Sequence, residues 1–135
     1  MVNPIFIVAI ALGTAFLLGL GSSKTLNISR LLMLLAVAAM TAISGSWLWG
    51  LYSGSVQGLD VFTAGFKPPF AINLRMTMNE AFMTFMINVF GLLSVVYLWD
   101  TLKAAGKYAH SIFLFFMLGV NVSVMTRDIF NLFVF

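Results

Sequence analysis

The chain alternates between long runs of apolar residues and short polar segments. No charged residue precedes Lys24, and each apolar run approaches the length of about 20 residues that a helix needs to cross a bilayer. We therefore predict an all-α integral membrane protein with four membrane-spanning helices, over residues 4–21, 31–52, 79–99 and 108–126.

Two segments depart from this pattern. Residues 53–76 are rich in glycine and contain a proline pair, which disfavours helix, so we expect an external loop here. Residues 59–62 and 70–74 are short β-type runs within it and are candidates for a small β-hairpin. Residues 128–135 resemble the first two turns of a fifth helix and are far too few to cross a bilayer.

The composition supports a location in the membrane. Hydrophobic residues make up 61% of the chain and charged residues only 8%, whereas soluble domains carry about 25% charged residues. We interpret residues 1–135 as one membrane domain. The formal net charge of +3 is better explained as an orientation signal than as a surface for nucleic acid. The absence of cysteine excludes disulfides and thiolate sites.

The distribution of basic residues predicts the orientation. Four of the seven lie in the short turns after the first and third predicted helices: Lys24, Arg30, Lys103 and Lys107. The opposite side carries the other three, together with most of the acidic residues. Because Lys and Arg are enriched in cytoplasmic loops, we expect a multi-pass protein of the cell (inner or plasma) membrane, with the amino terminus and the loop outside.

Small residues recur every four positions in the first two predicted helices. They are Ala11, Ala15 and Gly19 in the first, and Ala38, Ala42, Ser46 and Gly50 in the second. This spacing allows helix backbones to approach closely in a membrane. We expect both stripes to pack against neighbouring helices, with a substrate groove as the alternative.

Ion carriers usually hold an ionisable group inside a membrane span, and this chain offers few. His110, about one turn inside the fourth predicted helix, is a candidate for proton transfer or for a hydrogen-bonded anchor. Asn88, Asn121 and Asn131 are uncharged, and we expect them to hydrogen-bond between helices. No serine has a matched His/Asp base, so we predict no catalytic residue, no metal site and no cofactor.

Arg127 and Asp128 form the last polar break. Asp128 suits the N-cap of the partial helix, where its carboxylate would satisfy free backbone amides. The alternative is the acidic mouth of an ion path, in which Asp128 pairs with Arg127 or with a neighbouring subunit. With His110 and Asn131, these two residues are the candidates for an ion path or an interface.

Two motifs resemble one protein family. Residues 126–135 read Thr-Arg-Asp-Ile-Phe-Asn-Leu-Phe-Val-Phe, which closely resembles the Thr-x-Asp-Leu-Phe-Asn-Leu-Phe-Val-Phe segment of Mrp-type Na⁺/H⁺ antiporter D subunits. The same family includes the antiporter-like subunits of energy-converting membrane-bound hydrogenases and of respiratory complex I. Residues 67–75, Lys-Pro-Pro-Phe-Ala-Ile-Asn-Leu-Arg, look like the Pro-Phe-Gly-Ile-x-Leu stretch before the third helix of that family. The resemblance covers essentially the whole chain and about the first quarter of a family member.

This resemblance implies that the chain corresponds to the peripheral helices that precede the first proton-channel repeat of the family. In that family the fifth helix continues into a buried glutamate, and a lysine two helices later is the partner of this glutamate. Neither group is present up to Phe135. We therefore expect a non-catalytic membrane subunit, the amino-terminal piece of a split antiporter-like subunit. Its complex would be a multisubunit cation (Na⁺)/proton antiporter or a redox-driven ion pump, an ion-translocating oxidoreductase of the hydrogenase or complex I type. Its partners would be the lipid bilayer and larger membrane subunits that carry the remaining helices.

Two other functions fit the size and span number of the chain. One is a stand-alone four-helix carrier that works as a homodimer, although residues 5–20 lack the glutamate that small multidrug-resistance carriers hold in their first span. The other is a structural or assembly subunit without a transport role. The sequence leaves open whether the complex is redox-driven and whether it exports sodium or protons.

Overall fold

The computed structural model describes residues 2–21, 26–62, 73–127 and 129–134. Its elements are α1 (Ile5–Leu20), α2 (Leu26–Tyr52), β1 (Leu59–Phe62), β2 (Asn73–Met76), α3 (Met78–Tyr97), α4 (Trp99–Ala104), α5 (Ala109–Met125) and α6 (Ile129–Val134). The helical character predicted from the sequence is confirmed.

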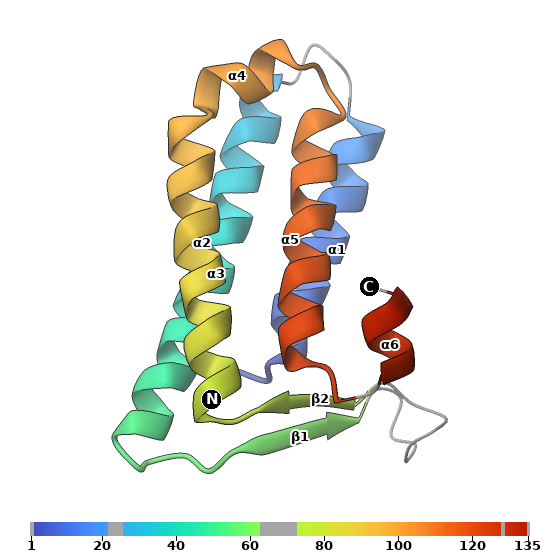
Figure 1. Cartoon of the computed structure of the whole chain (residues 1–135). Helices are drawn as coiled ribbons and strands as arrows, with labels where there is room; N and C mark the ends of the chain where they lie inside the picture. Colours follow the sequence, from blue (N-terminus) through green and yellow to red (C-terminus); the bar gives the residue numbers. More distant parts are fainter. Residues whose placement is uncertain (1, 22–25, 63–72, 128, 135) are drawn as a thin grey trace.

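The four long helices form an up-and-down bundle (Figure 1). Helix α2 packs against α1 and α3, and α5 packs against the same two helices from the other side. The short helix α4 closes one end of the bundle, and the two strands close the other (Figure 1). We call these the α4 end and the sheet end.

The helix boundaries differ from the expected ones at the α4 end. Helix α2 begins at Leu26 rather than at residue 31, and polar side chains near its start make contacts within the structure. Arg30 Nη2 donates to Asn27 Oδ1 at 2.8 Å, and its guanidinium lies 4.8 Å from the Trp99 ring centroid. Helix α3 ends at Tyr97, whereas the third span was expected to end at residue 99. The short helix α4 follows in place of the expected polar turn.

The strands β1 and β2 pair antiparallel, with Leu59 opposite Met76 and Phe62 opposite Asn73. The described second strand overlaps the expected run at residues 73–74 and continues to Met76, whereas residues 70–72 lie outside the described residues. The reason is burial: Leu74 and Met76 point into the core, together with Val61 of β1. Thr126 forms a further antiparallel bridge with Leu74, so the chain leaving α5 joins the edge of the sheet.

The two stripes of small residues behave differently. In α1, Ala11 and Ala15 are fully buried, and Ser111 Oγ of α5 donates to the Ala15 carbonyl at 2.7 Å, so the predicted close packing is confirmed there. In α2, Ala42 and Ser46 are exposed, and the prediction is wrong for them. The neighbours of α2 instead cover its opposite face, on which Met40 and other bulky residues are buried.

Large apolar side chains cover the outside of the bundle as well as its inside. Exposed examples occur on every long helix: Phe16 and Leu17 on α1, Leu35 and Trp49 on α2, Phe90 and Leu93 on α3, and Ile112 and Phe116 on α5. Helices that are apolar all round need an apolar surrounding. By length and composition α2 and α3 are able to cross a membrane, and α1 and α5 are shorter apolar helices.

A small polar cluster lies in the middle of the apolar core. Asn88 of α3 and Asn121 of α5 are fully buried and exchange two amide hydrogen bonds, each 3.1 Å long. Asn121 Nδ2 also donates to the Met117 carbonyl, and Asn88 Nδ2 donates to Ser44 Oγ of α2 at 3.4 Å. The predicted role of these two asparagines in linking helices is confirmed.

The Met117 side chain of α5 packs closely over Gly91 of α3. A Cβ atom at this position would lie 2.3 Å from Met117 Cε and 2.8 Å from its sulfur. We expect Gly91→Leu to lower the free energy of unfolding by about 1–3 kcal/mol because the core has no room for the side chain. Thermal unfolding of the purified chain in detergent measures the change. Gly13→Leu is the control, since a Cβ there meets nothing within 4 Å, and an equal loss in both variants would contradict this account.

The amide pair makes a second prediction. Asn88→Leu should destabilise the bundle by about 1–3 kcal/mol because the buried amide of Asn121 loses its partner. Asn121→Leu should have a similar effect, and the double variant should lose clearly less than the sum of the two. Denaturant unfolding of the three variants gives the coupling energy, and strictly additive losses would show that the two amides do not act as a pair.

Candidate functional site

At the sheet end, contacts connect the first turn of α3 with strand β2 and the end of α5. Glu80, in the first turn of α3, accepts a hydrogen bond from the backbone amide of Thr77 at 3.0 Å. Its other carboxylate oxygen lies 3.9 Å from Arg127 Nη2. The Arg127 amide in turn donates to the Asn73 carbonyl at 3.2 Å. These contacts thus connect the start of α3, the end of α5 and strand β2.

The four residues selected from the sequence fall in different settings. Arg127 is about half-exposed and pairs with Glu80. Asp128 lies outside the described residues, so the structure does not test its N-cap or ion-path role. Asn131 belongs to α6, but its side chain is not among those that the structure describes.

Helix α6 lies outside the bundle and touches the end of α5 (Figure 1). Its described side chains are largely exposed and apolar: Ile129, Leu132, Phe133 and Val134. Phe133 is 91% exposed. This short helix therefore presents a hydrophobic surface next to the hydrogen bonds and the ion pair of the sheet end.

His110 lies at the opposite end of the bundle, in the first turn of α5. It is fully buried, and neither ring nitrogen has a hydrogen-bond partner among the described residues. The hydrogen-bonded anchor that the sequence suggested thus has no partner there. Arg30, near the start of α2, pairs with Asp100 at 3.4 Å. The structure does not bring His110 and Arg127 together, so the four residues do not form one site.

Sequence inspection missed Glu80 as the partner of Arg127, and it missed Thr84. Glu80, Thr84 and Asn88 are spaced four residues apart, which places them on one face of a helix. That spacing is the signal that could have identified them as a group. All three lie on the inner side of α3, where Thr84 and Asn88 are fully buried.

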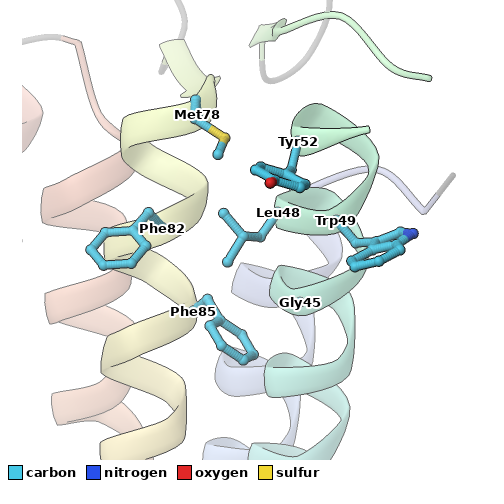
Figure 2. Close-up of a pocket in the computed structure, with 7 residues that line it drawn as sticks. All are labelled: Gly45, Leu48, Trp49, Tyr52, Met78, Phe82 and Phe85. Atoms are coloured by element: carbon cyan, nitrogen blue, oxygen red, sulfur yellow. The ribbon is translucent and has the colours of Figure 1, made fainter. Parts of the chain in front are cut away.

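An apolar groove of about 420 Å³ lies between α2 and α3 near the sheet end. It is lined by Gly45, Leu48, Trp49, Tyr52, Met78, Phe82 and Phe85 (Figure 2). None of these residues carries a carboxylate, an amine or an imidazole, so the groove offers mainly apolar contact area beside the Tyr52 phenol. Among the described residues, no group of three His, Cys, Asp or Glu side chains is arranged to hold a metal ion.

Comparison with known proteins finds a relative by sequence. No family model matches the chain. It is 34% identical, over 84 residues, to a probable D subunit of a K⁺/H⁺ antiporter from Rhizobium meliloti (strain 1021), and the match covers 62% of this chain and 16% of that protein. The chain thus matches only about a sixth of the length of this relative.

A solved structure has the same fold. It is a chain of the membrane-bound sulfane sulfur reductase (MBS), described as an archaeal respiratory membrane complex. The TM-score is 0.81 at 24% identity, and the match covers 97% of this chain and 27% of that chain. The sequence match agrees with the resemblance to antiporter D subunits that the motifs at residues 67–75 and 126–135 indicated, and the solved structure shows the same fold.

Proposed function

We propose that the chain is a non-catalytic membrane subunit of a cation/proton antiporter-like complex, to which it contributes a four-helix bundle of an antiporter-like subunit. The observation that carries this proposal is the sequence match to an antiporter D subunit. The fold shared with a chain of a respiratory membrane complex supports it. The parent complex would then exchange a monovalent cation such as Na⁺ or K⁺ for protons, alone or coupled to a redox reaction.

The core of the bundle fits a supporting role in that complex. A group that holds a charge in transit is usually an ionisable side chain inside the membrane. In the described residues, the buried middle of the bundle contains amides and hydroxyls but no carboxylate, lysine or arginine. The bundle therefore offers packing surfaces and hydrogen bonds, and its partner subunits would supply the groups that bind the moving ions.

We further propose that all four long helices cross the bilayer, with the sheet end outside. Helix α1 has 16 residues and α5 has 17, which correspond to about 24–26 Å at about 1.5 Å per residue. Both pack along α2 or α3, which are long enough to cross, so all four lie in the same layer. The basic residues at the α4 end then face the cytoplasm.

Cysteine labelling tests this topology, and the chain contains no cysteine of its own. We expect Asp60→Cys, in β1 at the sheet end, to react with a membrane-impermeant maleimide added to intact cells. Asp100→Cys, whose parent side chain is 97% exposed at the α4 end, should react only after the membrane is opened. Labelling of both from the same side would contradict four crossings.

Affinity purification tests the assembly. A tagged chain extracted in mild detergent should co-purify with larger membrane subunits. The mass of the tagged polypeptide shows whether it is a separate subunit of 14.8 kDa. A small homo-oligomer without partners, or cation/proton exchange by the purified chain alone in proteoliposomes, would favour the stand-alone carrier instead. A complex that still exchanges ions after losing this chain would indicate an assembly role.

A further inference from the structure

A second apolar groove, of about 560 Å³, lies where the chain passes from α4 to α5. Leu102 and Ala105 line it at the end of α4. On α5 its lining includes Tyr108, Ile112 and Phe116, which are four residues apart and therefore share one face of the helix. These three side chains are exposed. The groove thus follows the outside of α5 for about 12 Å, at about 1.5 Å per residue, from the α4 end toward the middle of the bundle.

Two lysines lie on the turn that forms the mouth of this groove. Gly106 has a φ of 102°, which glycine adopts without strain, and its amide donates to the Lys103 carbonyl at 3.3 Å. This tight turn places Lys107 directly before α5. Lys107 Nζ lies 4.6 Å from the centroid of the Tyr108 ring, and Tyr108 lines the groove. The lysine charge is therefore held beside the groove.

The positive charge at this mouth is not neutralised by the described part of the chain. Neither lysine has an acidic partner among the described residues. Asp100 of α4 is the nearby carboxylate in the sequence, and it pairs with Arg30 at 3.4 Å. Helix α5 has no acidic residue in its first turn, so the positive end of its dipole adds to the lysine charges. An apolar groove with a positive mouth results.

We propose that this groove binds an anionic phospholipid, with one acyl chain along α5 and the headgroup phosphate at the mouth with Lys103 and Lys107. Basic residues directly beside a membrane helix attract anionic lipid headgroups, and the apolar lining provides contact area for an acyl chain. An apolar helix of a partner subunit would fit the groove less well, because it would cover the lysine charges without supplying a counter-charge.

This inference goes beyond the proposed function, because it does not depend on which complex the bundle joins or which ion that complex carries. It rests on one part of the topology proposal, namely that α5 lies in the bilayer with its first turn at the surface. The binding test uses the full chain without partner subunits, so its outcome is separate from that of the assembly experiment.

Native mass spectrometry of the purified chain in detergent tests the role of the charge. The chain is offered equal amounts of phosphatidylglycerol and phosphatidylcholine with the same acyl chains, and we expect it to bind the anionic lipid preferentially. Lys107→Gln should lower this preference about three- to fivefold. Arg75→Gln is the control, because it removes the same charge from β2 at the sheet end, and it should keep the preference of the parent chain.

A second pair of variants tests the groove itself. Ala109→Trp places a large side chain in the lining and should reduce the binding of both lipids. Ala42→Trp adds the same side chain at an exposed position of α2 and should leave binding unchanged. Should the Ala109 variant not fold, Ala105→Trp repeats the test at an exposed position of the lining.

Three results would overturn the proposal: equal binding of the two lipids by the parent chain, equal effects of Lys107→Gln and Arg75→Gln, or unchanged binding after the groove is filled. A crosslink in cell membranes identifies the occupant. With the photoreactive p-benzoylphenylalanine in place of the exposed Ile112, we expect an adduct with the mass of a phospholipid. An adduct with another polypeptide, or the absence of a lipid adduct, would also overturn the proposal.

Discussion

In a helix bundle that is apolar on both its inner and outer faces, the paired amides of Asn88 and Asn121 supply the directional contact between α3 and α5. Hydrophobic burial alone discriminates poorly between the two faces of such helices, because lipid tails are as apolar as the core. Buried amides, by contrast, must meet each other. The hydrogen bond from Asn88 to Ser44 connects α2 to this amide pair. The small residues of α1 allow α1 to pack close to α5.

The polar contacts at the sheet end have a related effect. Thr126 pairs with Leu74, and Arg127 binds both the Asn73 carbonyl and Glu80. These contacts hold the segment after α5 against the strand that leads into α3. Beyond this point α6 touches the end of α5, and its described side chains are largely exposed.

The chain spans only part of the length of the proteins that it resembles. The chain matches only 16% of an antiporter D subunit and 27% of a chain from a respiratory membrane complex. The bundle has several faces that its own helices leave uncovered. They include the apolar groove between α2 and α3 and the exposed stripe with Ala42 and Ser46.

The sequence by itself determined the long helices, because runs of apolar residues without charges have few alternatives in a membrane. It also indicated the family, through two short motifs, and the role of Asn88 and Asn121, since a buried amide in an apolar helix needs a partner. Only the tertiary structure decided which face of α2 is buried, because Ala42 and Met40 are both acceptable to lipid and to the core. It likewise decided that Arg127 pairs with Glu80, since residues so far apart in the sequence meet only when α3, α5 and β2 are packed together. The tertiary structure also shows that Thr84 is a buried hydroxyl without a partner among the described residues.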